Sequence, residues 1–224
     1  MTRRALLSWS SGKDSAWALH RLRERDDLEL IGLVTTVNEV AGRVAMHAVR
    51  EALLAEQARA IGLPVWRVPI PSPCSNAEYA AAMTQLVTRA RDEGVEVMAF
   101  GDLFLEDIRA YRVGQLEGSG IEPIFPVWGE DTARLAREMV EAGLRAHVTC
   151  VDPQQLSPRF VGRTFDGAFL DELPDGVDPC GERGEFHTFA WAGPMFSAPI
   201  PVVPGPVVER DGFHFADLLP GSAS

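Results

Sequence analysis

The segment ALLSWSSGKDS, residues 5–15, carries most of what this chain reveals about its fold. Its first residues, Ala5–Leu7, are typical of a short buried strand, while the serines and the glycine that follow are typical of a turn. A helix is expected from Ser15 to about Arg25. The unpaired N–H groups at the start of such a helix favour a negatively charged ligand. The segment therefore predicts a phosphate-binding loop between a strand and a helix.

Two familiar phosphate-binding motifs do not fit this loop. A Walker A motif aligned on Gly12 needs a glycine where the sequence has Leu7 and a hydroxyl residue where it has Asp14. A dinucleotide-binding fingerprint needs several glycines, and Gly12 is the only glycine in the loop. A serine-rich turn that simply caps the helix stays open as a third explanation.

Beyond the loop, strand-like and helix-like segments alternate. Further strands are expected at 28–36, 65–70, 95–100, 121–125 and 146–151. Helices are expected at 49–61, 75–94, 105–116 and 131–143, with Ser75 and Asp131 as caps. Such alternation is typical of right-handed β–α–β units, whose strands form a parallel sheet covered by helices. We therefore predict an α/β fold with a Rossmann-like parallel sheet.

The sequence pattern changes after about residue 152. Five prolines fall between Pro194 and Pro206, which excludes a helix or a central strand there and favours an edge segment. Val207–Arg210 and Phe213–Ala216 are expected to form a hairpin on a two-residue Asp-Gly turn. We predict an ATP-type nucleotide-binding domain at 1–131 and a smaller, irregular α+β region for substrate binding at 132–224.

Composition limits the function classes. The chain has 21 Lys and Arg against 32 Asp and Glu, a net charge of −11. Proteins that bind nucleic acid through its backbone need a basic surface, so no nucleic-acid partner is expected. No apolar run approaches the roughly 20 residues that span a bilayer. The apolar start is too short for a secretion signal, so we expect a cytoplasmic protein without a membrane partner.

The chain contains a single lysine, Lys13, and its other basic residues are arginines. A lysine ammonium is a compact point charge, whereas the arginine guanidinium is a planar fork, and a tight phosphate loop favours the former. Asp14 is acidic where a phosphate would arrive, which suggests a bound cation such as Mg²⁺. Because Lys13 is expected in a loop, its replacement by Ala should leave folding nearly unchanged.

The loop SSGKDS, residues 10–15, resembles the Ser-Gly-Gly-x-Asp-Ser loop of the PP-loop ATP pyrophosphatases, with Ser11 in place of the first glycine. Two later segments narrow the resemblance. Gly101-Asp102 follows an expected strand, and CGERGEFHT, residues 180–188, is a dense run of glycine, acid and threonine. With Pro126-Val127-Trp128 between them, these motifs in this order resemble the diphthine–ammonia ligase family over nearly the whole chain.

The resemblance implies an ATP-dependent amidation, in which a carboxylate is adenylated, pyrophosphate leaves, and ammonia displaces AMP. ATP and Mg²⁺ are the implied cofactors. The implied partners are ammonia and a carboxylate that is either a small molecule or borne on a protein. A monomer and a homodimer both stay open. So do two other functions, a PP-loop tRNA-modifying enzyme and a non-catalytic ATP sensor, although the lack of Cys-x-x-Cys pairs and the acidic C-terminal region disfavour the former.

The resemblance also implies roles for individual residues. The residues implied in ATP binding are Ser10, Ser11, Gly12, Lys13, Asp14, Ser15, Thr35, Thr36 and Gly101. Those implied in catalysis are Lys13, Asp14, Asp102, Glu182 and Glu185, with Asp14 as a ligand of Mg²⁺. Those implied in substrate binding are Glu106, Arg109, His187 and Thr188.

Simpler explanations stay open for several of these residues. Thr35 and Thr36 are also ordinary strand-end residues, and Asp102 is also a suitable helix cap. Glu106, Arg109 and Arg112 follow one another at intervals of three residues, so an exposed, ion-paired helix face explains them as well as substrate binding does. His47 and His187 are each candidates for a proton shuttle, but a lone histidine is more often structural.

Overall fold

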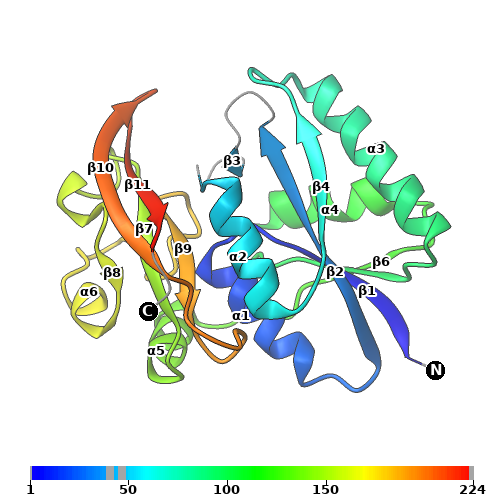
Figure 1. Ribbon diagram of the computed structural model, residues 1–224, viewed down its shortest axis with the longest axis horizontal. Coiled ribbons are helices and arrows are strands. Elements are labelled where there is room, and N and C mark those ends of the chain that lie inside the picture. The colour runs from blue at the N-terminus through cyan, green and yellow to red at the C-terminus, as the bar shows by residue number, and fades with distance from the viewer. Residues whose placement is uncertain (1, 39–42, 45–48, 222–224) are drawn as a thin grey trace.

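The computed structural model describes residues 2–38, 43–44 and 49–221, which form two β-sheets side by side (Figure 1). The first sheet and its helices comprise β1 (Arg3–Ser8), α1 (Lys13–Arg23), β2 (Leu28–Asn38), β3 (Arg43–Val44), α2 (Glu51–Ile61), β4 (Val65–Ile70), α3 (Asn76–Asp92), β5 (Val97–Ala99), α4 (Glu106–Leu116) and β6 (Glu122–Ile124). The second comprises α5 (Thr132–Glu141), β7 (Arg145–Val151), the 3₁₀ turn η1 (Pro158–Phe160), β8 (Thr164–Phe165), α6 (Gly167–Asp171), β9 (Phe186–Ala192), β10 (Val202–Arg210) and β11 (Phe213–Pro220).

The first sheet is parallel apart from its shortest strand. β4, β2, β1, β5 and β6 pair in that order, and β3 runs antiparallel against the end of β2. β1 lies between β2 and β5, so the chain switches sides of the sheet at β1. In open α/β sheets, ligands bind at such a switch point, outside the carboxyl ends of the strands. The predicted α/β fold is confirmed, and the loops after β1 and β5 become the place to look for a site.

Local sequence signals account for most helix ends. Ser75 and Glu78 form the predicted capping box of α3, and the Asp131 side chain accepts a hydrogen bond from the Arg134 N–H at the start of α5. α1 differs from the expectation, because it begins two residues earlier, at Lys13. The Ala16 N–H already donates to the Gly12 carbonyl, so the first helical turn includes Lys13.

The second sheet is more regular than the sequence suggested. The predicted hairpin is present as β10 and β11, and β10 is an edge strand in which Pro204 precedes a bulge. The expectation of an irregular region was wrong, because β9 runs antiparallel to β7 and completes a five-stranded sheet. The aromatic and β-branched residues of β9, such as Phe186 and Thr188, favour a strand.

The two sheets share one apolar core. A single cluster of buried side chains extends from Leu7 and Trp17 of the first sheet and its helix to Phe186 and Phe189 of β9. A smaller cluster, which includes Trp66 and the apolar face of α3, covers the other side of the first sheet. Figure 1 shows α1 and α2 between the two sheets. The second sheet is therefore packed onto the first rather than tethered to it.

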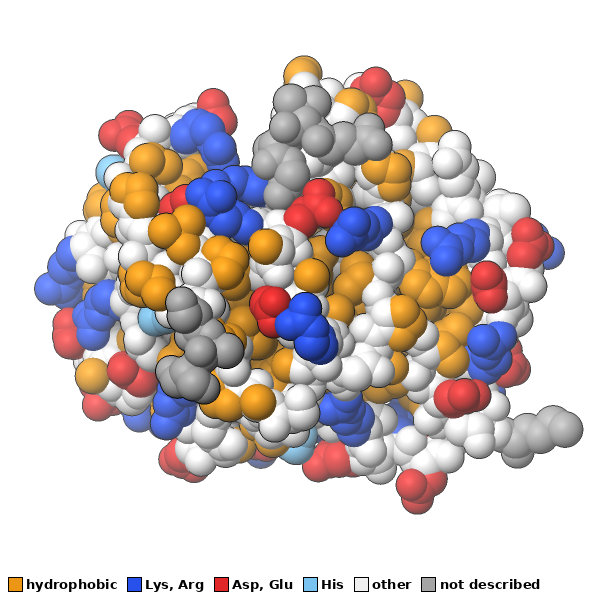
Figure 2. All heavy atoms as spheres, viewed as in Figure 1, with side chains coloured by type: hydrophobic (Ala, Val, Ile, Leu, Met, Phe, Trp, Pro, Cys, Tyr) orange, Lys and Arg blue, Asp and Glu red, His pale blue; other side chains and the backbone are white. Residues whose placement is uncertain are grey.

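The face drawn in Figure 2 carries acidic and basic side chains interspersed with apolar ones, without a continuous basic stripe. In the described part of the chain, no helix is both long and apolar enough to cross a bilayer.

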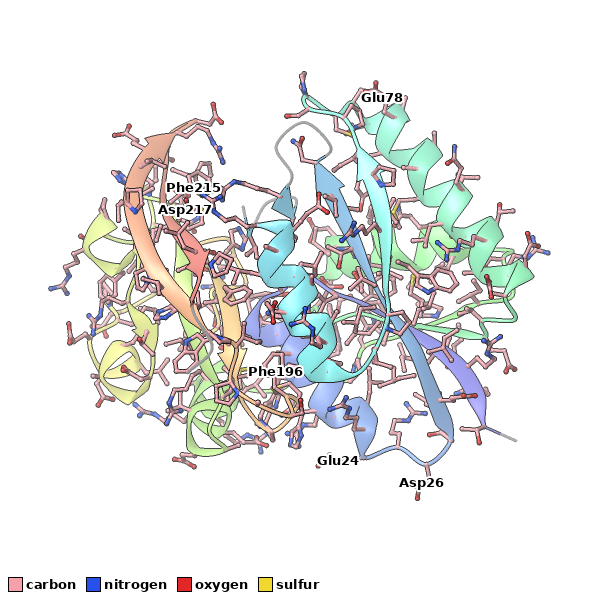
Figure 3. The ribbon with its side chains drawn as sticks, in the orientation of Figure 1. Glu24, Asp26, Glu78, Phe196, Phe215 and Asp217 are labelled. Carbon is pink, nitrogen blue, oxygen red and sulfur yellow. The ribbon has the colours of Figure 1, made fainter. Side chains whose placement is uncertain are left out.

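An ion-pair network also joins the two sheets. Asp217 of β11 accepts hydrogen bonds from Arg50, at 3.1 and 2.5 Å, and from Arg43, at 3.0 Å. Figure 3 labels Asp217 near β3 and α2, the elements that begin at or next to these arginines. Hydrogen bonds from Arg50 hold the pKa of Asp217 below its usual value, although partial burial opposes them.

We expect Asp217→Asn to lower the free energy of unfolding by about 1–3 kcal/mol at pH 7, because charge-assisted hydrogen bonds are lost in a half-buried site. The folded-state pKa lies below the unfolded value, so this stabilisation is present above about pH 4 and is lost as the pH falls through the folded pKa. Urea unfolding at pH 7 and at about pH 3 measures both.

The matched control is Asp171→Asn, because Asp171 pairs with Arg137 while their side chains are 66% and 58% exposed. Exposed pairs contribute roughly 0–1 kcal/mol, so this variant should unfold almost as the wild type does. Equal losses of unfolding free energy in the two variants would contradict the inter-sheet role. So would a loss of unfolding free energy in Asp217→Asn that persists at low pH.

Candidate functional site

Two adjoining cavities open at the carboxyl ends of β1 and β5. The first, of about 350 Å³, is mainly apolar and is lined by residues such as Trp9, Thr36, Tyr79 and Met98; we call it the apolar pocket. The second, of about 360 Å³, is the polar pocket, and both the loop after β1 and the segment 181–188 line it. Four residues line both: Ser8, Ser10, Phe100 and Arg112. The pockets therefore form one elongated cavity at the switch point.

The loop after β1 is held from behind by the second sheet. The Ser11 carbonyl accepts hydrogen bonds from the Ala190 N–H of β9, at 2.9 Å, and from Gln57 Nε2, at 3.0 Å. Ser11 has φ +69°, a left-handed conformation that favours glycine. Its Oγ is buried and has no hydrogen-bond partner among the described residues. The loop thus keeps the bend of a glycine-containing phosphate loop despite the side chain at Ser11.

The Ser10 and Ser15 hydroxyl groups face the polar pocket at the start of α1. Their Oγ atoms lie 3.2 Å apart, and Ser15 Oγ donates to the Gly12 carbonyl at 3.0 Å. The first N–H groups of α1 lie beside them, because Gly12 is its N-cap. Hydroxyl groups and helical N–H groups together form a site suited to a phosphate.

Lys13 is buried at the centre of the site, with only 1% of its surface exposed. Its ammonium group donates to both carboxylate oxygens of Asp14, at 3.0 and 2.9 Å, and to the Cys180 carbonyl. Its backbone N–H donates to Thr188 Oγ1 at 3.1 Å. Burial is the largest single influence on the pKa of Lys13 and acts to lower it. The charge and hydrogen bonds of Asp14, with the charges of Cys180 and Asp178, together outweigh burial, so the pKa lies above its usual value.

The expectation that Lys13 lies in a loop was wrong, because it is the first residue of α1 and is buried. Its burial argues against the expectation that its replacement leaves folding nearly unchanged. Sequence spacing located the residue correctly beside the pocket, but its burial depends on Cys180 and Thr188, which lie far away in the chain. A charged group buried without these partners would be strongly destabilising.

The loop after β5 approaches the loop after β1 closely. A Cβ on Gly101 would lie 3.0 Å from the backbone of both Asp14 and Ser15, so only glycine fits there without displacing α1. Asp102 lines the polar pocket, and its carboxylate lies 3.7 Å from the Arg112 guanidinium. Burial raises the pKa of Asp102, and Arg112 partly opposes this. Asp102 does not cap α4, whose N-cap is Leu105.

The segment 178–185 is held by two buried carboxylates. Glu185 accepts hydrogen bonds from the N–H groups of Asp178, at 2.9 Å, and of Arg183, at 3.0 Å. Asp178 in turn accepts from the Glu182 N–H at 2.8 Å. Glu185 is 2% exposed, and it does not line the polar pocket. Glu185 therefore holds the shape of the loop, whereas Glu182 is the carboxylate of this loop that lines the polar pocket.

Glu182 reaches across the cavity from the second sheet to the first. Its Oε1 accepts a hydrogen bond from the Leu103 N–H at 2.8 Å. Burial is the main factor that raises the pKa of Glu182 to about 7. The nearby charges of Asp14 and Asp102 add to this, whereas the hydrogen bond from Leu103 opposes it. Burial likewise raises the pKa of Asp14 and of Asp102, so the carboxylates of this pocket hold their protons more readily than exposed ones do.

The structure brings most of the sequence-predicted site residues together. Those that line the polar pocket are Ser10, Lys13, Asp14, Ser15, Gly101, Asp102, Glu182, His187 and Thr188. Thr36 lines the apolar pocket, whereas Thr35 is buried and donates to the Trp9 carbonyl at 2.8 Å. Ser11, Gly12 and Glu185 lie behind the cavity wall, where they support it.

Glu106 and Arg109 do not line either pocket. They form an ion pair at 4.0 Å, with side chains that are 79% and 42% exposed, and the Arg109 guanidinium lies over the Trp128 ring. They lie on the exposed face of α4. Of the two arginines, Arg112 rather than Arg109 lines the cavity. His47 falls outside the described residues.

Three residues of the site were not foreseen. Asp178 stands two residues before the recognised segment 180–188, so proximity to that motif was its only signal. Gln57 lies on the buried face of α2 between Leu53 and Ile61, and it bonds to Trp9 Nε1 and to the Ser11 and Ala190 carbonyls. A polar residue at an apolar helix position is a signal that it has buried partners. Arg112, on the same helix as Glu106 and Arg109, lines both pockets although it was not among the predicted site residues.

Comparisons with known proteins match both halves of the chain to one family. Residues 3–116 match the model of the diphthamide synthase N-terminal domain, and residues 131–215 match that of the diphthamide synthase C-terminal domain. A diphthine–ammonia ligase from Danio rerio is 28% identical over 87% of this chain and 79% of its own length. The Homo sapiens protein of that name is 29% identical over 72% of this chain and 66% of its own length. The Rattus norvegicus protein is 28% identical over 93% of this chain and 86% of its own length.

We expect Lys13→Met to lower the free energy of unfolding by about 2–4 kcal/mol, although the side-chain volume is nearly kept. The variant leaves the Asp14 carboxylate and the Cys180 carbonyl without their donor inside the protein. Urea unfolding measures the loss. Arg59→Met is the control, because Arg59 is 70% exposed, and it should change stability by less than about 0.5 kcal/mol. A Lys13 variant as stable as this control would refute the anchoring role.

We expect Glu185→Gln to lower the melting temperature by roughly 2–8 °C, because the amide offers one acceptor oxygen to two backbone N–H groups and leaves one of them unpaired. Differential scanning calorimetry measures the shift. Glu209→Gln, on the exposed surface of β10, is the control and should melt with the wild type. An unshifted transition in Glu185→Gln would mean that the carboxylate does not hold the loop.

Proposed function

Because this chain belongs to the diphthamide synthase family, we propose that it is an ATP-dependent amide ligase. It activates a carboxylate as an acyl-adenylate, releases pyrophosphate, and transfers ammonia to the activated carbon with loss of AMP. The observation that carries the proposal is the single elongated cavity at the switch point, which joins an apolar pocket to a phosphate-type helix N-terminus and a wall of carboxylates.

ATP would occupy the cavity along its length. The apolar pocket, with Thr36 at its wall, suits the adenine and ribose, and the start of α1, with Ser10 and Ser15, suits the phosphates. Arg112 lines both pockets, so its guanidinium would stand beside the bond to be broken. Cleavage between the α and β phosphates would leave AMP on the acceptor carboxylate and pyrophosphate at the helix.

Mg²⁺ would enter with the nucleotide. No three or more His, Cys, Asp or Glu side chains are grouped for a metal in the described part of the chain. Mg²⁺ bound to ATP needs only one or two protein carboxylates, since phosphate oxygens and water complete its shell. Asp14 lines the polar pocket beside the helix N-terminus and fits this role. When bound, the ion would neutralise charge on the leaving pyrophosphate.

The remaining part of the polar pocket would receive the acceptor. It lies between α4 and the segment 181–188, so residues 1–131 would supply the nucleotide site and residues 132–224 much of the acceptor site. The relatives are named for diphthine and ammonia. We propose the same two classes here, a carboxylate that is a small molecule or protein-borne, and ammonia.

The decisive assay measures pyrophosphate and AMP release from ATP in the presence of a metabolite pool or a diphthine-bearing protein, with and without ammonium chloride. Mass spectrometry then identifies the amide. We expect equal amounts of pyrophosphate, AMP and amide, and amide only with ammonium. Binding of ATP without pyrophosphate release for any carboxylate would favour a nucleotide sensor, and salt-sensitive binding of tRNA would favour a tRNA-modifying enzyme.

We expect Gly101→Ala to weaken ATP binding by about tenfold or more, because its Cβ would press on the backbone at Asp14 and Ser15, where the phosphates would bind. Gly114→Ala is the control: Gly114 lies in α4 with open space around it, so the variant should bind ATP normally and gain about 0.5–1 kcal/mol of stability. Calorimetric titration with ATP measures both. Normal affinity in Gly101→Ala would place the phosphates elsewhere.

A further inference from the structure

Transfer of ammonia requires a proton acceptor in the cavity. In water near neutral pH, ammonia is present almost entirely as ammonium, which has no lone pair and cannot attack a carbonyl carbon. The enzyme must therefore remove a proton from ammonium close to the acyl-adenylate. This requirement rests on the function proposed above.

The side chains of the polar pocket that can accept a proton are Asp14, Asp102, Glu182 and His187. Two of them are already engaged with cations. Both oxygens of Asp14 bind the Lys13 ammonium, and Asp102 faces the Arg112 guanidinium at 3.7 Å. A carboxylate that already faces a cation in the protein has less room to bind an ammonium ion, so neither is as well placed as Glu182 to take a proton from it.

Glu182 is held in a different way. Its Oε1 accepts the Leu103 N–H at 2.8 Å, and its own N–H donates to Asp178 at 2.8 Å, so the residue is fixed at both ends. Among the described residues, its Oε2 accepts no hydrogen bond. One oxygen thus anchors the side chain and the other is available to a ligand in the pocket.

The surroundings of Glu182 suit both a cation and a proton. Burial, and then the charges of Asp14 and Asp102, raise its pKa to about 7, against the opposing effects of the Leu103 N–H and of Lys13. A carboxyl group with a pKa near the working pH accepts and releases a proton with little penalty either way. Glu182 lines the polar pocket, so its second carboxylate oxygen can accept a hydrogen bond from an ammonium ion there.

We infer that Glu182 is the base that removes a proton from an ammonium ion held beside it and so delivers ammonia to the activated carboxylate. The proton moves from nitrogen to Glu182 Oε2 and leaves a lone pair on the nitrogen. That lone pair forms the C–N bond, and the bond between the carbonyl carbon and the AMP oxygen breaks with its electron pair on AMP. The nitrogen then loses a second proton to water, so one ammonium gives one amide and two protons.

Hydroxylamine separates proton removal from every earlier step, because it is largely unprotonated at neutral pH and needs no base. Wild type and Glu182→Gln are given ATP, the carboxylate that supports pyrophosphate release, and either ammonium chloride or hydroxylamine. We expect the variant to lose amide formation by about 100-fold or more and to keep hydroxamate formation within about tenfold of wild type. Glu209→Gln, on exposed β10, is the control and should match wild type with both nucleophiles.

Several outcomes would overturn the inference. Equal losses with both nucleophiles would place Glu182 in carboxylate activation, and unchanged amide formation would remove it from the reaction. A selective loss in His187→Gln instead would make the histidine the base. If wild type releases no pyrophosphate with any carboxylate, the proposed ligase function fails, and the role of Glu182 as a base fails with it.

A second measurement needs no acceptor and keeps these failures apart. In the full chain labelled with ¹³C at glutamate carboxyls, the Glu182 resonance is assigned by its loss in Glu182→Gln. We expect it to titrate with a midpoint near 7 and to shift with ammonium chloride but not with equal tetramethylammonium chloride. A midpoint below about 5, or no ammonium-specific shift, would overturn the inference. An ammonium-specific shift in a protein without ligase activity would support an ammonium site at Glu182 and refute the proposed amidation.

Discussion

A single ammonium group, that of Lys13, sets the constraint on which the cavity depends. With 1% of its surface exposed, Lys13 cannot keep its charge unless protein groups replace water around it. One partner, Asp14, is the next residue in the chain, but the other, the Cys180 carbonyl, belongs to the second sheet's region. The start of α1 is therefore held by contacts with the segments around Cys180 and Thr188, which join the two sheets at this point.

The remaining contacts follow from that arrangement. Gln57 and Ala190 fasten the back of the phosphate loop, while Glu182 reaches forward to the Leu103 N–H after β5. The cavity is thus enclosed by elements from both sheets, and its carboxylates are drawn out of water together. Burial and mutual repulsion then raise the pKa of Glu182 to about 7, which gives the cavity a titratable group near neutral pH.

The features that the sequence predicted correctly are those that depend on residues close together in the chain. The strand–loop–helix at residues 5–15, the capping box at Ser75 and the Asp211-Gly212 hairpin are all short-range features, and all are present. The burial of Lys13 and the support role of Glu185 were missed because both depend on partners that only the folded chain brings near. Motif spacing could identify the residues around the cavity, but not which of them face it.

The claim that both regions build one nucleotide site is tested most directly by amide hydrogen exchange with and without the ATP analogue in which a methylene replaces the oxygen between the α and β phosphates. This analogue binds without being cleaved at that bond. We expect exchange to slow on binding both at residues 8–16 and at residues 178–190, since Lys13 and Ser11 connect these segments. Slowing at residues 8–16 alone, with residues 178–190 unchanged, would contradict it.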